Sequence, residues 1–368
     1  MNPHRRHWLM RLAGAAAAAA LPPARGGTEE ASVQRGRVLS FPRDHGAHLA
    51  ARTEWWYATG WLAGPDGVEP RHGFQVTFFR SRTGLAQGNP SRFAARHLLF
   101  AHAALTTLKD GRHQHDQRMA RWSGALGAVL GDADTVDARV RLGDWRLHRD
   151  ATGWHAQVPA RGFSLDLALL PTQPLVLQGD AGYSQKGPDP RQASHYYSLP
   201  QLDVRATLPA SGAGPLRGRA WLDHEWSDEI LAADAVGWDW IGINLFDGGA
   251  LTAFVLRRAD GSAVWAGGSH RALGGPVSNF DTAHVRWLPG RRWTSPATAA
   301  QYPVHWTITT PLGRHTVRAL VDAQELDSRS STGTVYWEGL SELLDETGRR
   351  VGLGYLEMTG YAGALRLG

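Results

Sequence analysis

Cysteine is absent from this chain of 368 residues, so neither a disulfide framework nor a thiolate metal site can form. Lysine is nearly absent, because only Lys109 and Lys186 occur among the 39 basic residues. A charge imbalance is also missing from the body of the chain: without the four arginines of the first 25 residues, 35 basic residues face 34 acidic ones. The composition therefore gives no clustered basic footprint, and we expect no nucleic-acid partner.

A hydrophobic run long enough to cross a bilayer is missing as well. The alanine-rich run from Leu12 to Pro23 has 12 residues, whereas a transmembrane helix needs about 20. It follows a basic stretch containing Arg5-Arg6, and Ala24 supplies a small residue after it, which is typical of a signal peptide over residues 1–26. The arginine pair resembles a twin-arginine signal, although His4 replaces the usual Ser or Thr. We expect export by the Tat or Sec route to the periplasm or beyond, with a buried N-terminal helix as the alternative.

Short apolar or alternating runs separated by turn dipeptides fill the rest of the chain. The segments 53–62 and 73–80, joined by Gly64-Pro65-Asp66-Gly67, predict one β-hairpin. A second, tighter hairpin is predicted for 241–246 and 251–257. Further strands are expected at 137–147, 164–170, 216–222, 263–265, 304–309, 315–321, 334–338 and 350–358. This spacing favours an all-β fold of antiparallel barrels or sandwiches.

The two hairpins resemble each other, since each begins with closely spaced tryptophans and ends at an arginine, Arg80 or Arg257. This similarity predicts an internal duplication, with chance similarity of two hairpins as the alternative. A duplication would divide the chain into two domains, which we place at residues 36–229 and 230–368.

Several familiar catalytic motifs are incomplete. Gly182-Tyr183-Ser184-Gln185 is followed by Lys186, which excludes the nucleophile elbow of α/β-hydrolases. His224-Glu225 begins like a zinc-protease helix, but Asp228 stands at the place of the second histidine. The glycine-rich nucleotide-binding signatures are broken too, and we expect no metal and no cofactor.

Three clusters combine aromatic and ionisable side chains more densely than a core requires. They are Glu54-Trp55-Trp56-Tyr57, the segment 223–228, and Trp238-Asp239-Trp240 with Asp247 in the following turn. Alternation along a strand places Asp223 and Glu225 on one face, and His224 and Trp226 on the other. We expect a barrel interior lined by such groups to bind an apolar ligand, and its desolvated carboxyl groups to act as proton donors. Ordinary core packing and loop anchoring are the alternative interpretation.

A fourth segment supplies hydroxyl groups and a lone lysine. It comprises residues 182–187 and 193–198, and we expect it to form a long functional loop or lid at a barrel mouth.

These residues carry a family resemblance. The clusters above, together with 74–80, 182–187 and 355–361, resemble the signatures of secreted lipocalin-like proteins related to carotenoid 1,2-hydratase (CrtC), the AttH-like family. The resemblance runs from about residue 38 to the C-terminus. It implies two lipocalin-like (calycin-type) antiparallel β-barrels and an apolar ligand site. In the hydratase branch an acidic residue protonates an alkene, aromatic rings stabilise the cation, and water adds.

Residue by residue, His224 and Trp226 match the His-x-Trp element of the hydratases, and Asp247 matches their acid. Glu225, Ser227 and Leu245 differ from that branch, which puts carotenoid specificity in doubt. The residues that we assign to catalysis are Asp223, His224, Glu225, Asp239 and Asp247. Those that we assign to ligand binding are Glu54, Trp55, Trp56, Tyr57, Tyr183, Lys186, Tyr196, Tyr197, Trp226, Trp238 and Trp240.

Three functions remain open from the sequence. The first is an enzyme that hydrates or hydrolyses a hydrophobic, polyene-like substrate by acid catalysis. The second is a non-enzymatic carrier of lipid or envelope assembly factor, and the third is a secreted glycan-binding or glycosidase domain. The oligomeric state is not predicted.

Overall fold

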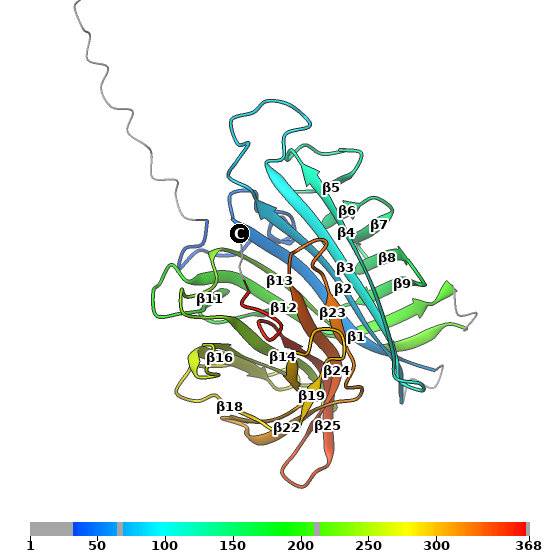
Figure 1. The fold of residues 1–368 in the computed structure, drawn as a ribbon, viewed down its shortest axis with the longest axis vertical. Coiled ribbons are helices and arrows are strands. Elements are labelled where there is room, and N and C mark those ends of the chain that lie inside the picture. The colour runs from blue at the N-terminus through cyan, green and yellow to red at the C-terminus, as the bar shows by residue number, and fades with distance from the viewer. Residues whose placement is uncertain (1–31, 65–68, 210–213, 366–368) are drawn as a thin grey trace, which may run out of the picture. The chain divides into compact units, whose positions relative to one another are not determined.

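The computed structural model describes residues 32–64, 69–209 and 214–365, and these described residues belong to one compact unit (Figure 1). The predicted signal peptide and the tip of the first predicted hairpin lie outside the described residues. Among the described residues, no helix is long and apolar enough to span a membrane.

Two large antiparallel sheets make up the fold, together with a 3-10 turn, η1 (Arg43–His45). The first sheet contains β1 (Thr53–Ala63), β2 (Pro70–Arg82), β3 (His97–Thr107), β4 (Arg112–Trp122), β5 (Gly131–Ala133), β6 (Arg139–Leu142), β7 (Trp145–Arg149), β8 (Trp154–Ala160), β9 (Phe163–Leu170), β10 (Val176–Leu177), β11 (Tyr183–Gln185), β12 (Ala193–Thr207) and β13 (Leu216–Glu229). Contacts of β5 and β6 with β3 and β4 bring its two edges together, so this sheet forms a nearly closed barrel.

Seven residues separate the end of the first sheet from the start of the second. It contains β14 (Gly237–Leu245), β15 (Ala250–Arg257), β16 (Ala263–Arg271), β17 (Val277–Phe280), β18 (Arg286–Pro289), β21 (His305–Thr310), β22 (Gly313–Ala319), β23 (Glu325–Asp327), β24 (Val335–Leu344) and β25 (Arg350–Met358), while β19 (Arg292–Thr294) pairs with β20 (Gln301–Pro303). The chain therefore passes from the first sheet to the second between residues 229 and 237. Independent domains with the boundaries given above stay a prediction.

Both predicted hairpins are present, as β1–β2 and β14–β15. The lid expected at 182–187 and 193–198 is wrong, because these segments form β11 and the start of β12, which pair with each other. Residues 194–198 then pair with β13 in the middle of the first sheet. The hydroxyl groups of Ser194, Tyr196 and Ser198 donate hydrogen bonds to the acidic residues of β13, which explains why a central strand has a loop-like, polar composition.

The two sheets share one order of strands. In each, the first strand pairs with both the second and the last, so that β4-β3-β2-β1-β13-β12 corresponds to β17-β16-β15-β14-β25-β24. This correspondence agrees with the internal duplication that the sequence predicts.

Burial patterns show how the sheets contact each other. Strand β9 alternates buried with more exposed residues, as expected when one face covers the barrel core and the other faces water. Strands β14, β15 and β24 are almost wholly buried, because their outer faces pack against the outer face of the first sheet. At this contact a Cβ atom on Gly73 of β2 would lie 2.8 Å from the Tyr355 hydroxyl oxygen of β25. Glycine at this position permits the close approach of the two sheets.

Candidate functional site

A cavity of about 350 Å³ lies between the outer faces of the two sheets. The interior of the first barrel, where we expected the ligand site, is instead filled by a core that includes the fully buried Trp56, Trp145, Trp154 and Trp226. The walls of the cavity come from β1, β2, β3, β12 and β13 on one side and from β14, β15, β24 and β25 on the other.

Equivalent rows of side chains line the two walls. In the first sheet, cross-strand neighbours run Phe79, Trp55, Glu225 and Tyr196. In the second sheet, the corresponding neighbours run Phe254, Trp240, Glu357 and Glu338. Each wall thus places a carboxyl group beside an indole ring and a phenyl ring.

Asp223 is the most constrained carboxyl group of the first wall. It accepts hydrogen bonds from the Trp221 indole N–H at 2.7 Å, from the Tyr196 hydroxyl at 2.9 Å and from the Ser198 hydroxyl. Burial raises the pKa of Asp223 to about 7, even though these three donors stabilise the anion. The group can therefore gain or lose a proton near neutral pH.

Glu225 carries a counter-ion. Its Oε1 atom lies 3.0 Å from the Lys186 Nζ atom and accepts a hydrogen bond from the Ser194 hydroxyl. The ammonium group of Lys186 also lies over the Phe254 ring, 4.3 Å from its centroid. Because Phe254 belongs to the second sheet, this cation contacts both walls.

Two glutamates lie side by side in the second wall. Glu338 and Glu357 are direct cross-strand partners on β24 and β25; Glu338 is buried and Glu357 is half-buried. Burial raises the pKa of Glu357 to about 8, against a hydrogen bond from the Trp238 indole N–H at 3.1 Å. Burial and the neighbouring Glu357 charge raise the pKa of Glu338 as well. The pair therefore holds at least one proton at neutral pH.

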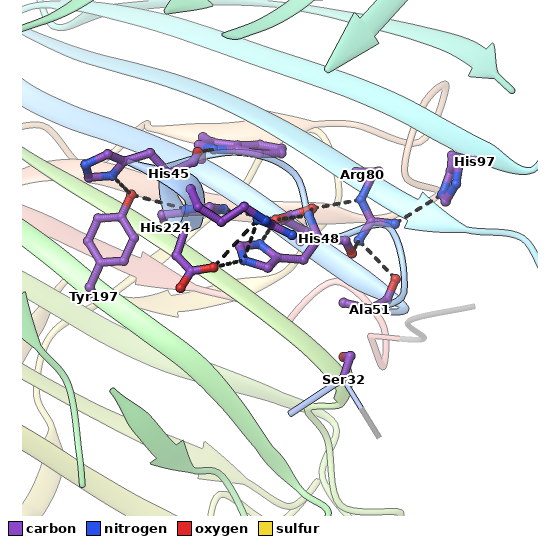
Figure 2. Close-up of polar contacts among 12 residues, drawn as sticks. Ser32, His45, His48, Ala51, Arg80, His97, Tyr197 and His224 are labelled. Carbon is purple, nitrogen blue, oxygen red and sulfur yellow. Dashed lines mark hydrogen bonds and ion pairs between the residues drawn. The ribbon is translucent and has the colours of Figure 1, made fainter. Parts of the chain in front are cut away.

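A polar network crosses the inside of the first barrel, and Figure 2 shows it running from His45 and Tyr197 to Arg80 and His97. At its centre Glu54 accepts hydrogen bonds from His48 Nδ1 at 2.7 Å, His224 Nε2 at 3.1 Å and Arg80 Nε at 2.8 Å. Burial opposes ionisation of Glu54, but the Arg80 charge and these hydrogen bonds keep its pKa well below the usual range. The network stabilises the buried glutamate as an anion.

Three residues of this network, His48, Glu54 and His224, have nitrogen or oxygen atoms that all lie within 4.8 Å of one another, as a metal site requires. His48, Glu54 and His224 are fully or nearly fully buried, and the guanidinium group of Arg80 already occupies one side of the carboxylate. Repulsion between this guanidinium and a metal cation disfavours metal binding here, so we regard the cluster as structural.

Comparison with known proteins identifies the family, since the AttH-like model matches residues 32–361. The chain belongs to the AttH-like family. A protein from Nitrosomonas europaea, provisionally described as AttH, has a structure with a TM-score of 0.81 and 42% identity, over 89% of this chain and 99% of that one. None of the curated proteins compared with the chain matches it.

More distant structures share the fold of this AttH-like protein. Kievitone hydratase from Nectria haematococca has a TM-score of 0.65 at 13% identity, over 90% of this chain and 96% of that one. CghA bound to Sch210972 has a TM-score of 0.52 at 13% identity, over 92% and 96%. The lipocalin-like, all-β fold implied by the family resemblance is thereby confirmed.

The structure separates the residues assigned from the sequence into two groups. Those that line the cavity of this AttH-like protein are Glu54, Trp55, Tyr57, Lys186, Tyr196, Asp223, Glu225, Trp238 and Trp240. The carboxylate of Glu54, however, hydrogen-bonds within the interior network. Those that lie elsewhere are Trp56, Tyr183, Tyr197, His224, Trp226, Asp239 and Asp247.

The assigned residues that lie outside the cavity make other contacts. His224 and Trp226 face the barrel interior, as their alternation with Asp223 and Glu225 requires. Asp239 faces the core of the second sheet, where it pairs with Arg257 at 2.9 Å. Asp247 is exposed and accepts the N–H of Gly249 within a turn. The proposal of Asp247 as the acid therefore does not fit the cavity.

Sequence reasoning missed the second carboxyl pair. Glu338 and Glu357 are each the one acidic residue of a predicted strand, at 334–338 and 350–358. A lone carboxylate in a strand buried on both faces was the available signal. His102 and Tyr336, which are hydrogen-bonded to each other at 2.9 Å in the cavity wall, had no such signal.

Proposed function

We propose that this AttH-like protein is an enzyme that adds water to, or removes water from, a mainly apolar small molecule held between its two sheets. The observation that carries the proposal is a largely apolar cavity with carboxyl groups whose pKa values lie near 7 and 8, those of Asp223 and Glu357. Groups that titrate near the working pH are effective general acids and bases.

The proposed hydration begins with transfer of a proton from a neutral carboxylic acid to one carbon of an alkene. Trp55, Trp240 and Phe254 present aromatic side chains to the resulting carbocation, and each ring stabilises a cation by about 0.5 to 2 kcal/mol. A water oxygen then bonds to the cationic carbon and releases its extra proton to a carboxylate. Exchange of protons with solvent then restores both the acid and the carboxylate, and dehydration is the same sequence in reverse.

Asp223 is our first candidate for the proton donor, with the Glu338–Glu357 pair as the group that accepts the proton from water. Asp223 approaches from the first sheet and the glutamate pair from the second, so that a substrate between the walls has a titratable group on each side. The Lys186–Glu225 ion pair supplies a polar anchor for a hydroxyl or carbonyl group of the substrate.

The test uses water labelled with ¹⁸O and a panel of isoprenoid alkenes with their tertiary alcohols. Mass spectrometry should detect one added labelled water in an alkene product, or loss of water from an alcohol. Asp223→Asn and Glu357→Gln should lower turnover at least a hundredfold, in the range typical of a lost general acid. Asp247→Asn, which changes an exposed carboxyl group outside the cavity, is the matched control.

Two outcomes would contradict the proposal. Full turnover in both cavity variants would remove acid–base catalysis by these carboxyl groups. Tight binding of panel members without any conversion by the unaltered protein would favour the carrier function instead.

We also propose that the chain is exported, on the strength of the basic segment and short apolar run before Ala24. N-terminal sequencing of the protein from a periplasmic fraction should show cleavage near residue 26. Recovery of the protein from the cytoplasm alone, with its N-terminus intact, would contradict export.

A further inference from the structure

Two neighbouring loops of the first barrel expose an unusual number of large apolar side chains. The loop 83–96 joins β2 to β3 and exposes 91% of Leu85 and 78% of Phe93. The loop 123–130 joins β4 to β5 and exposes 88% of Val129 and about half of Leu126 and Leu130. Exposed apolar groups gathered in this way indicate an interaction surface.

The two loops are in contact. Arg96 Nη1 donates a hydrogen bond to the Ser123 carbonyl oxygen at 3.3 Å, and a groove between the loops is lined by residues of both. Figure 1 shows them together at one end of the sheet, the first in cyan and the second in blue-green. The two loops therefore lie side by side, and we call their five exposed apolar residues the loop patch (Leu85, Phe93, Leu126, Val129 and Leu130).

The charged residues within the two loops are all basic. The segments 83–96 and 121–131 contain Arg92, Arg96 and Arg121 but no acidic residue. Asp132, the first acidic residue after them, accepts a hydrogen bond from the Gly127 backbone N–H, and its charge is paired with that of Arg141. Apolar anchors surrounded by arginines fit a surface that is both apolar and anionic.

The loop patch also lies at the end of the strands that line the cavity. The cross-strand neighbours Ser81 and Leu98 both line the cavity, and loop 83–96 begins two residues beyond Ser81. A surface bound to these loops would thus lie near the cavity.

We propose that the loop patch docks this protein onto an anionic lipid membrane, with Leu85, Phe93 and Val129 inserted among the lipid chains and the arginines against the headgroups. A membrane explains both the apolar side chains and the uniform positive charge, whereas a second copy of the patch would bring like charges together. This inference does not depend on the reaction proposed above.

The absence of cysteine provides a direct test, since a single introduced cysteine can carry an environment-sensitive fluorophore. Leu85→Cys and Val129→Cys would report from the loop patch, and Leu273→Cys, at an exposed position of the second sheet's loops, is the control. With vesicles of phosphatidylcholine and phosphatidylglycerol, the labels at 85 and 129 should shift to the blue while the label at 273 does not. Because the signal is local, binding through the N-terminal segment would not imitate it.

The charge dependence is tested in the same assay. Arg92→Gln and Arg121→Gln should each weaken binding to the anionic vesicles about fivefold, and salt should weaken it in the unaltered protein. A matched exposed arginine of the second sheet, Arg314→Gln, should have little effect. Circular dichroism of every variant checks that the fold is unchanged.

Three results would overturn the proposal. The labels in the loop patch could fail to respond to any vesicle, or respond equally to vesicles of phosphatidylcholine alone at all salt concentrations. They could also shift without lipid as the protein concentration rises, with a doubled mass in light scattering, which would assign the loop patch to an interface between copies.

Discussion

Replacement of Asp223 by asparagine should change how the stability of the protein depends on pH. The pKa of Asp223 rises from its usual 3.8 to about 7 in the folded protein, so the folded state binds a proton more tightly than the unfolded chain does. Its contribution to stability is complete below pH 4 and is lost as the pH rises towards 7. The full loss corresponds to about 4 kcal/mol, of which about 2 to 3 kcal/mol falls between pH 5 and pH 8.

Asparagine can keep most of the local hydrogen bonds. Its carbonyl oxygen can accept from the Trp221 indole N–H, while its amide can donate to the Tyr196 hydroxyl oxygen. We therefore expect Asp223→Asn to fold. Between pH 5 and pH 8, its free energy of unfolding should fall by about 2 to 3 kcal/mol less than that of the unaltered protein.

Urea unfolding at both pH values measures this difference, with Asp247→Asn as the control that should follow the unaltered protein. Glu357 and the other titrating groups are present in both proteins, so their contributions to the pH dependence of stability cancel to first order in this comparison. If the unaltered protein and Asp223→Asn lost equal stability between the two pH values, the reasoning about the buried carboxyl group would be refuted.

Three further predictions concern the pH dependence of activity, the pKa of Glu357 and the interior network. In the proposed reaction, kcat should fall as the pH rises through about 7, because Asp223, the proposed donor, loses its proton; a profile that stays flat above pH 7 would contradict this assignment. Trp238→Phe removes a hydrogen bond to Glu357, so the pKa of Glu357 should rise, and a titration of Glu357 followed by infrared spectroscopy should detect the change. Glu54→Gln leaves the Arg80 guanidinium buried without its carboxylate, and urea titration should show a loss of about 3 to 5 kcal/mol; an unchanged midpoint would count against the network.

The strands that the sequence predicts well are those with regular alternation and a clear turn, such as the two hairpins. Strand β12 was missed because residues 193–198 are rich in serine and tyrosine. The hydroxyl groups of Ser194, Tyr196 and Ser198 are in the sheet centre because they hydrogen-bond to Asp223 and Glu225, partners about 30 residues away along the chain. Such a pairing depends on strand register, which local composition does not determine.

The candidate site was predicted in part for a similar reason. Alternation correctly separates Asp223 and Glu225 from His224 and Trp226, but it does not say which face is the barrel interior. Both faces of β13 are buried, one by the barrel core and one by the second sheet, so hydrophobicity offers no distinction. Glu338 and Glu357 belong to the candidate site only because the second sheet packs against the first, and this packing is a property of the whole fold.

The matching rows in the two walls suggest how such a protein arose. Trp55 with Glu225 and Trp240 with Glu357 occupy equivalent places, and the buried pairs Glu54–Arg80 and Asp239–Arg257 lie behind them. A half-length ancestor with this pattern would have needed to associate face to face with a twin to enclose any chamber. Gene fusion would then have freed each half to specialise, so that today one contributes the lysine and the aspartate and the other the paired glutamates.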